Sequence, residues 1–153
     1  ISFEGIPALY LNSLFGKSND EAKYIITGNN RDINRYKWNY KNISKKLNNK
    51  NSKQSIFFTK ISNLLKVRRK QKAFHPNASR HNLNLGSNFF SFKRVSIDKD
   101  QTIICITNLS SKIQKTHLNK IYHGWNNLIG PKIETKNKLL ILKPFETIWL
   151  SNR

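Results

Sequence analysis

The sequence of 153 residues contains no methionine and only one cysteine. Cys105 therefore has no partner for a disulfide within the chain. It lies in an apolar run, and we interpret it as a buried, unreactive thiol. This cysteine usage fits a reducing compartment, and we predict a cytoplasmic location. Because a complete reading frame normally supplies an initiator methionine, we expect the chain, which starts at Ile1, to be a fragment or a truncated coding region.

Acidic residues are also scarce, since 8 Asp and Glu stand against 28 Lys and Arg, for a formal net charge of +20. Such an excess predicts attraction to polyanions without identifying a partner. Asn, Lys and Ile, which AT-rich codons encode, are abundant throughout, so codon bias explains part of the basic character. No apolar run reaches about 18 residues, so we expect no membrane-spanning helix. The N-terminus lacks the features of a signal peptide.

Signatures of metal and cofactor sites are missing as well. No two histidines are spaced i, i+4 on a predicted helix, and none accompanies a second cysteine, so we predict no metal site. The sequence has no Ser/His/Asp pattern, phosphate-binding glycine-rich loop or dinucleotide fingerprint, and we expect no cofactor. The histidines are His75, His81, His117 and His123.

The first half of the chain begins with an apolar segment. Residues 6–12, opened by Pro7, are almost continuously apolar and predict a strand covered on both faces. Residues 13–42 are rich in turn signals, with a short helical turn expected around Glu21–Ile26. The segment therefore predicts one strand followed by a long loop.

The strongest helix signal spans residues 52–72. Ser52 is a plausible N-cap, and cations are concentrated at the C-terminal end, where the helix dipole favours them. A shorter helix is expected from residue 43 until Asn48–Asn51 interrupts it. Phe74–Pro76 should stop the long helix.

From residue 81 onward the apolar period changes to two, which is typical of strands. Several short strands, separated by turn signals, predict a small antiparallel β-sandwich at about 83–150. The expected strands are 83–85, 89–95, 102–107, 139–142 and 147–150.

Few carboxylates are placed for the paired acid chemistry that glycoside cleavage requires. Asp20, Glu21 and Asp32 alone follow the predicted strand, on the face where barrels place active sites. An acid pair of Asp20 and Asp32 is one interpretation. In the other, both carboxylates hold the loop through cations such as Lys17, Arg31 and Arg35. The remaining acids are Glu4, which precedes the strand, Asp98 and Asp100 in a predicted turn, and Glu134 and Glu146 in the predicted sandwich.

Arg31 is the sharper candidate for binding. Its planar guanidinium offers paired donors that can hold vicinal sugar hydroxyls or an anionic group. The alternative is a structural arginine paired with Asp32 or another acid of the loop. Spacing alone leaves both interpretations open.

Nucleic-acid binding is the second functional hypothesis. The basic helix 52–72 would neutralise phosphates, and Tyr36, Trp38 and Tyr40 could stack on bases. However, the cations are spread over the whole chain and no nucleic-acid-binding motif is present. A small basic nucleic-acid-binding protein therefore remains the alternative rather than the main hypothesis.

A family resemblance emerges from motifs found in order along nearly the whole chain. The sequence resembles the C-terminal part of sucrose phosphorylase-like enzymes of glycoside hydrolase family 13, and most of all the branch that contains glucosylglycerate phosphorylases. The matching segments are 5–16, 18–20, 27–28, 31–35, 38–39 and 73–78.

This resemblance implies an α/β plus all-β fold. Residues 1–78 would be the C-terminal end of a (β/α)8 TIM barrel, with its last strand and helices. Residues 79–153 would form the small antiparallel β-sandwich domain that follows.

The resemblance also implies an α-amylase-like enzyme of carbohydrate metabolism that transfers glucose by retaining phosphorolysis of an α-glucoside to glucose 1-phosphate. The three catalytic carboxylates would lie on earlier strands, so no catalytic residue maps to this chain and we expect the isolated chain to be inactive. Arg31 matches the arginine that holds the glucose, while Asp32 and Arg35 are expected to support the loop. The α-glucoside and phosphate would bind only after the missing barrel, on a longer chain or on a separate N-terminal chain, completes the site.

Overall fold

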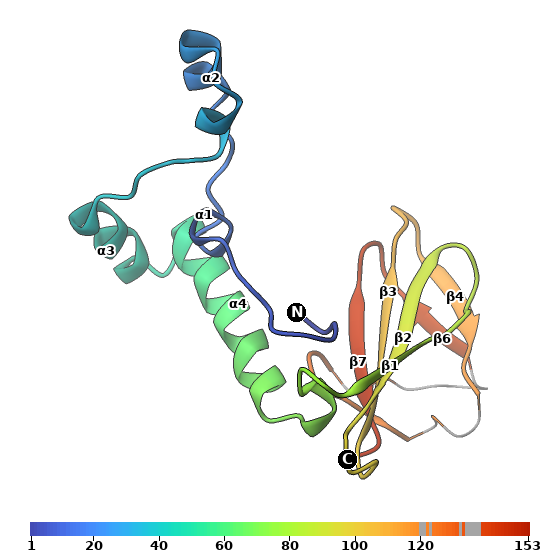
Figure 1. Cartoon of the computed structure of the whole chain (residues 1–153). Coiled ribbons are helices and arrows are strands. Elements are labelled where there is room, and N and C mark those ends of the chain that lie inside the picture. Colours follow the sequence, from blue (N-terminus) through green and yellow to red (C-terminus); the bar gives the residue numbers. More distant parts are fainter. Residues whose placement is uncertain (120–121, 123, 132, 134–138) are drawn as a thin grey trace. The chain divides into compact units, whose positions relative to one another are not determined.

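The computed structural model describes residues 1–119, 122, 124–131, 133 and 139–153. The chain forms two compact units (Figure 1). Unit 1 contains Ile1–Ile6 and Lys66–Arg153, and unit 2 contains Pro7–Leu65. The boundary between the units falls inside the helix Lys53–Arg69. The predicted domains 1–78 and 79–153 refer to a larger enzyme, and they stay a prediction.

Unit 2 is built from helices and loops. Its elements in chain order are α1 (Leu11–Leu14), α2 (Glu21–Thr27), the 3₁₀ helix η1 (Asn30–Ile33), α3 (Tyr40–Asn48) and the larger part of α4 (Lys53–Arg69). The prediction of a strand over residues 6–12 is wrong, because residues 6–10 have no regular structure and α1 follows. A strand needs a neighbour for its backbone N–H and C=O groups, and the described residues of unit 2 contain none.

Capping residues mark the start of α4 and the end of α2. Ser52 Oγ accepts the backbone N–H of Ser55 at 3.0 Å, which confirms the predicted N-cap of α4. The predicted helical turn near residues 21–26 is α2, which ends at Gly28 in the left-handed conformation (φ 63°). The helix α4 ends at Arg69, earlier than predicted, and the 3₁₀ helix η2 (Lys72–Phe74) follows.

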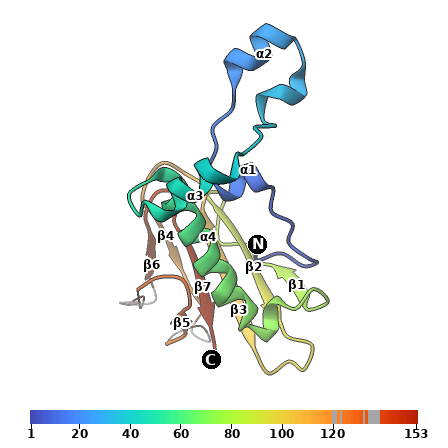
Figure 2. The same cartoon turned by 90° about the vertical axis from the view of Figure 1, so that its left-hand side faces the viewer.

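Unit 1 contains a five-stranded antiparallel sheet in the order β1-β2-β3-β7-β5 and a two-stranded sheet of β4 and β6 (Figures 1 and 2). The structure thus confirms a small antiparallel β domain. The strands are β1 (Ser79–Asn82), β2 (Phe89–Val95), β3 (Thr102–Asn108), β4 (Gln114–His117), β5 (Asn126–Asn127), β6 (Leu139–Leu142) and β7 (Thr147–Ser151).

Four of the five predicted strands are confirmed as β2, β3, β6 and β7. The predicted strand at 83–85 is wrong, because β1 pairs with β2 in the register Ser79↔Val95 to Asn82↔Phe92 and ends before Leu83. The polar strands β4 and β5 were not predicted, since their side chains carry no apolar alternation.

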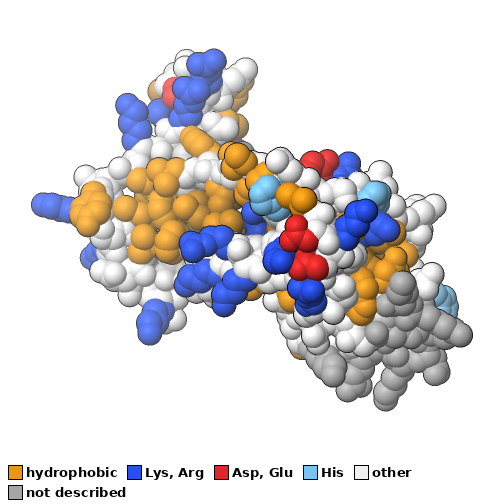
Figure 3. All heavy atoms as spheres, turned by 60° about the horizontal axis from the view of Figure 1, so that its bottom comes forward, with side chains coloured by type: hydrophobic (Ala, Val, Ile, Leu, Met, Phe, Trp, Pro, Cys, Tyr) orange, Lys and Arg blue, Asp and Glu red, His pale blue; other side chains and the backbone are white. Residues whose placement is uncertain are grey.

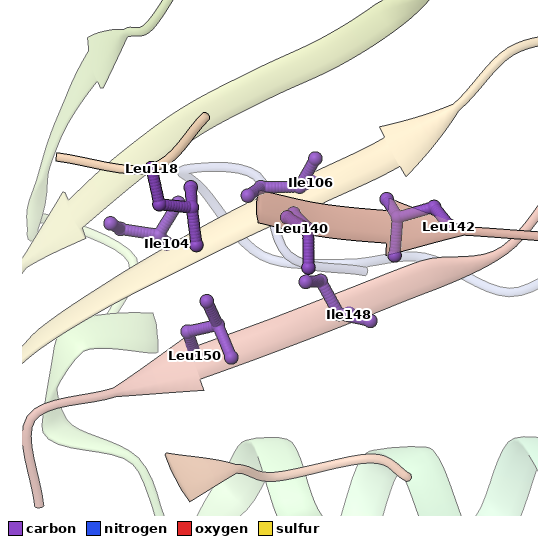
Figure 4. Close-up of a cluster of buried hydrophobic side chains, with 7 residues drawn as sticks. All are labelled: Ile104, Ile106, Leu118, Leu140, Leu142, Ile148 and Leu150. Atoms are coloured by element: carbon purple, nitrogen blue, oxygen red, sulfur yellow. The ribbon is translucent and has the colours of Figure 1, made fainter. Parts of the chain in front are cut away.

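The main core lies between the two sheets. Aliphatic side chains of β3 and β7 point toward those of β6 (Figure 4). Burying such side chains contributes roughly 1.5–3 kcal/mol each. The cluster consists of Ile104, Ile106, Leu118, Leu140, Leu142, Ile148 and Leu150.

The opposite face of β3 is also buried. Cys105 points there and is 2% exposed, and burial raises the pKa of its thiol to about 12. The interpretation of Cys105 as a buried thiol is confirmed. Phe74 of η2 packs edge-on against Trp149 of β7, with ring centroids 4.8 Å apart.

The first residues of the chain pack in unit 1 through arginines. The buried Arg94 guanidinium donates to the carbonyl oxygens of Ser2 (2.9 Å), His75 (2.8 Å) and Ala78 (3.2 Å). Glu4 pairs with Arg80 at 2.7 Å. A backbone hydrogen bond, and then the hydrogen bond from the Arg80 side chain, hold the Glu4 pKa below its usual value. Glu4 therefore has a structural partner.

No helix within the described residues has both the length and the apolar character needed to cross a bilayer.

Candidate functional site

Arg31 lies in η1, within a loop that its own backbone closes. The Asp20 N–H donates to the Ile33 carbonyl oxygen at 2.7 Å, which joins the two ends of the segment. Inside it, Asn29 Oδ1 accepts the Arg31 N–H at 3.0 Å. The Arg31 side chain is exposed, and its guanidinium makes no hydrogen bond or ion pair with any described residue. The loop therefore holds the Arg31 backbone and leaves the cationic group available.

Two acids of this loop, Asp20 and Asp32, have other partners. Asp32 pairs with Lys23 at 3.3 Å. Hydrogen bonds from the side chains of Thr27 and then Lys23 hold the Asp32 pKa below its usual value. Asp20 caps α2 by accepting the Lys23 N–H at 3.0 Å. Both carboxylates thus stabilise the loop, but through the side chain and the backbone N–H of Lys23 and not through the cations named from the sequence, and Arg31 is left unpaired.

A buried asparagine organises the segment that follows the loop. Asn12 of α1 is 5% exposed, and its Nδ2 donates to the carbonyl oxygens of Asn34 (2.8 Å) and Tyr36 (3.3 Å). Its Oδ1 accepts the Trp38 indole Nε1–H at 2.6 Å. Phe15 supports the indole edge-on, with ring centroids 5.5 Å apart. One amide side chain thus fixes residues 34–38 against α1.

The fixed segment forms one wall of a pocket of about 280 Å³ within unit 2. Its two aromatic residues, Tyr36 and Trp38, meet edge to face with centroids 4.8 Å apart. Lysines come from three separate places in the sequence, the turn after α1, the end of α3 and the start of α4. The lining residues are Gly16, Lys17, Ser18, Tyr36, Trp38, Lys46, Lys53 and Gln54.

The sequence did not predict this pocket. Tyr36 was considered only as a stacking partner for bases, and Trp38 as a stacking partner and as part of the matching segment 38–39. Lys53 was considered only as one cation of the basic helix 52–72, and Lys46 was not considered. Lys46 and Lys53 come together because Ser52 Oγ donates to the Lys46 carbonyl oxygen at the junction of α3 and α4. The sequence signal for that junction is the N-cap Ser52, which marks the helix start but not the position of the preceding helix.

The other acids noted in the sequence have structural roles or lie outside the described residues. Asp98 and Asp100 bind Lys72 at 3.4 and 2.8 Å, and Asp100 also binds Arg153 at 3.0 Å. Glu146 accepts a backbone N–H in a turn. Glu134 and His123 are not among the described residues, and across the described ranges no cluster of three His, Cys, Asp or Glu could hold a metal ion.

Figure 3 shows the lysine and arginine side chains on one face of the molecule. Lysine and arginine side chains there lie in several separate places, with one group beside acidic side chains. This distribution agrees with the even spread of cations along the sequence and gives nucleic-acid binding no additional support.

Comparison with known proteins finds three relatives that are all named glucosylglycerate phosphorylase. The chain is 29% identical to the glucosylglycerate phosphorylase of Escherichia coli K12 over 98% of its own length and 26% of that protein. It is 33% identical to the enzyme of the same name from Spirochaeta thermophila, over 99% of its own length and 28% of that protein. The chain therefore spans about a quarter of the length of these relatives. No family model matches the sequence.

Solved structures give a consistent fold. Trehalulose synthase MutB from Pseudomonas mesoacidophila MX-45 aligns with 71% of this chain and 19% of its own, with a TM-score of 0.53 and 16% identity. A single-substitution variant of that enzyme in complex with Tris aligns with 82% of this chain and 24% of its own, with a TM-score of 0.54. These neighbours are α-amylase-like enzymes of glycoside hydrolase family 13, and the likeness concerns the fold.

Together, the relatives confirm the resemblance on which the sequence motifs converge. The two glucosylglycerate phosphorylases align with nearly all of this chain, whereas the chain covers only part of their length. The structural neighbours share the fold expected of their glycoside hydrolase family. The chain is thus similar, over almost its whole length, to part of the glucosylglycerate phosphorylases, consistent with the C-terminal part of a glycoside hydrolase family 13 phosphorylase.

Proposed function

We propose that this chain forms the C-terminal part of an α-glucosyl-transferring enzyme that carries out retaining phosphorolysis of an α-glucoside to glucose 1-phosphate. The observation that supports this most is the similarity to glucosylglycerate phosphorylases over 98% of the chain. Glucosylglycerate and sucrose are the two donors that this branch suggests. The reaction would belong to carbohydrate metabolism in the cytoplasm.

In the complete enzyme, residues 1–78 would form the end of a (β/α)8 barrel. Exposed apolar side chains support this, since Ile6 is 85% and Leu11 is 51% exposed. The rest of the barrel would come from a longer chain or from a separate N-terminal chain.

Arg31 would hold the glucose of the donor. A charged group that is exposed, unpaired among the described residues and carried on a closed loop can donate two parallel hydrogen bonds to vicinal hydroxyls. The chain would contribute no nucleophile and no general acid, because the resemblance places the catalytic carboxylates on earlier strands, while Asp20 caps α2 and Asp32 binds Lys23. As an isolated chain it would therefore be inactive.

The test is a chimera in which residues 1–153 replace the matching segment of the Escherichia coli enzyme. The chimera should release glucose 1-phosphate from glucosylglycerate and phosphate. Arg31→Ala should lower kcat/KM roughly 10- to 150-fold, the effect of losing hydrogen bonds from a charged donor. Lys37→Ala removes a nearby exposed cation and should leave kcat/KM unchanged.

Two results would overturn the proposal. A chimera that is folded by circular dichroism and size but has no phosphorolytic activity would show that this chain cannot supply the missing segment. An active chimera in which Arg31→Ala has the same kcat/KM as the parent would remove the sugar-binding role of Arg31.

A further inference from the structure

The pocket of unit 2 that Tyr36 and Trp38 line contains three lysines and no acid. Between residues 7 and 65 the sequence has only three acidic residues, Asp20, Glu21 and Asp32, and none of them lines the pocket. Asp20 and Asp32 are engaged within the α2 loop. Because no carboxylate neutralises the lysines there, the pocket presents a concentrated positive charge.

The contacts of these lysines leave their charge available to a ligand. Lys53 Nζ contacts a neutral partner, Ser18 Oγ, at 3.2 Å. Lys17 Nζ lies 4.7 Å from the centroid of the Tyr36 ring, a cation–π contact that positions the ammonium without neutralising it. Lys46 is exposed, and its ammonium has no partner among the described residues. All three ammonium groups can therefore donate to an oxyanion.

The start of α4 adds donors of the same kind. The first-turn N–H groups of Lys53 and Gln54 have no intrahelical acceptor, while Ser52 already accepts the Ser55 N–H. Helix N-termini attract anions through these N–H groups and through the helix dipole. The lysine side chains and the start of α4 thus both favour an anionic ligand.

The pocket wall is held in place before any ligand arrives. Asn12 binds Trp38 at 2.6 Å and the Asn34 carbonyl oxygen at 2.8 Å. On the other side, Gly16 has φ +58°, and a Cβ there would lie 2.7 Å from Phe57 Cγ. A wall fixed in this way loses little conformational entropy on binding.

The lining and the volume define the ligand class. Lysines bind phosphate as point charges, the Ser18 hydroxyl and the Gln54 amide can bind hydroxyl groups, and the Tyr36–Trp38 pair offers an aromatic surface to a ring. The volume of about 280 Å³ is just below the range of roughly 300–1,000 Å³ in which drug-sized ligands bind. The ligand is therefore small.

We propose that this pocket binds a monosaccharide phosphate, with the phosphate on Lys17, Lys46 and Lys53 and the sugar against Tyr36 and Trp38. The pocket shares no lining residue with the Arg31 loop. The proposal therefore stands independently of the proposed phosphorolysis and holds for the chain by itself.

The experiment is a calorimetric titration of the full chain with three probes, namely glucose 6-phosphate, inorganic phosphate and glucose. Glucose 6-phosphate should bind most tightly, phosphate more weakly, and glucose most weakly of the three. The double variant Lys46→Ala/Lys53→Ala should weaken glucose 6-phosphate binding at least about tenfold. The matched control, Lys41→Ala/Lys60→Ala, removes the same charge from exposed positions of α3 and α4 outside the pocket and should change the Kd less than about twofold.

Each remaining outcome overturns a stated part of the proposal. Equal weakening in both double variants would show that the general positive field binds the phosphate. Phosphate binding as tight as glucose 6-phosphate would remove the sugar contact with Tyr36 and Trp38. Binding of a single-stranded oligonucleotide at about 150 mM salt, lost only in Lys46→Ala/Lys53→Ala, would assign the pocket to nucleic acid instead.

Trp38→Ala keeps all three lysines and should weaken glucose 6-phosphate binding but leave phosphate binding unchanged.

Discussion

Replacing Asn12 by alanine should loosen the indole of Trp38 while leaving unit 1 unchanged. Asn12 is almost fully buried and joins α1 to residues 34–38 through both ends of its amide. Alanine removes the acceptor of the Trp38 Nε1–H and the donor to the Asn34 and Tyr36 carbonyl oxygens. The segment that forms one wall of the pocket therefore loses its attachment.

The size of the effect follows from the exposure of the groups involved. The lost bond to Trp38 is 2.6 Å long, and a net contribution of about 1 kcal/mol is typical of such a hydrogen bond. The half-buried indole can reach water after opening, so the larger penalty for a fully buried, unsatisfied donor does not apply. About 1 kcal/mol corresponds to a roughly fivefold larger population of the open state.

The assay is the hydrogen-exchange rate of the Trp38 indole Nε1–H, followed as a resolved signal by NMR. In Asn12→Ala this rate should rise about fivefold, whereas the indole signal of Trp149 in unit 1 should exchange unchanged. Asn12→Asp keeps an acceptor for Trp38 but loses the donor to Asn34, so Trp38 exchange should rise less than in Asn12→Ala. Equal Trp38 exchange in Asn12→Ala and the parent would refute this reasoning.

Three further substitutions test other parts of the structure. Gly16→Ala should destabilise unit 2 by about 2 kcal/mol or more, because it combines left-handed strain with a clash against Phe57; the urea dependence of the Trp38 indole signal measures this. Ile104→Ala should lower the free energy of unfolding of unit 1 by about 2–5 kcal/mol in urea denaturation, because Ile104 is fully buried. In Asp100→Asn, the urea concentration at the unfolding midpoint of unit 1 should fall less than in the parent as the pH is lowered. Hydrogen bonds from Lys72 and then Ser96 lower the Asp100 pKa from 3.8 to about 2, so its contribution is complete above pH 3.8 and is lost as the pH falls through about 2.

Matched controls separate these effects from general damage. Gly28→Ala has similar left-handed strain (φ +63°) but no neighbour within 4 Å, so it should cost about 1 kcal/mol less than Gly16→Ala. Ile141→Ala changes a side chain that is 53% exposed and should cost less than about 1 kcal/mol. Equal costs within either pair, or parallel pH curves for Asp100→Asn and the parent, would contradict the physical reasons given.

Local signals in the sequence were sufficient where the structure depends on local interactions. Ser52 marked the start of α4 because its hydroxyl caps the first turn. The strands β2 and β3 were predicted because their apolar side chains are dense and their ends carry turn residues. Arg31 was selected from its motif, and its role in sugar binding stays a prediction. That Asp32 does not pair with Arg31 became visible only in the structure, since Lys23 binds that carboxylate.

The sequence was insufficient where the structure of a segment depends on contact with another segment. The apolar segment 6–12 has the composition of a buried strand, but composition does not show whether a neighbouring strand is present to pair with it. The polar strand β4 forms only because it pairs with β6, in the register Gln114↔Leu142 to His117↔Leu139. The pocket lysines come from three separate segments, so their proximity depends on tertiary structure and not on any spacing in the sequence.

The most direct test of the functional account is a phosphorolysis assay on the isolated 153-residue chain, with glucosylglycerate or sucrose as donor and inorganic phosphate as acceptor. The account predicts no glucose 1-phosphate above the level without protein, because in the proposed function the chain supplies the sugar-binding Arg31 while the catalytic carboxylates come from the rest of the barrel. Phosphate-dependent release of glucose 1-phosphate by the isolated chain would contradict it.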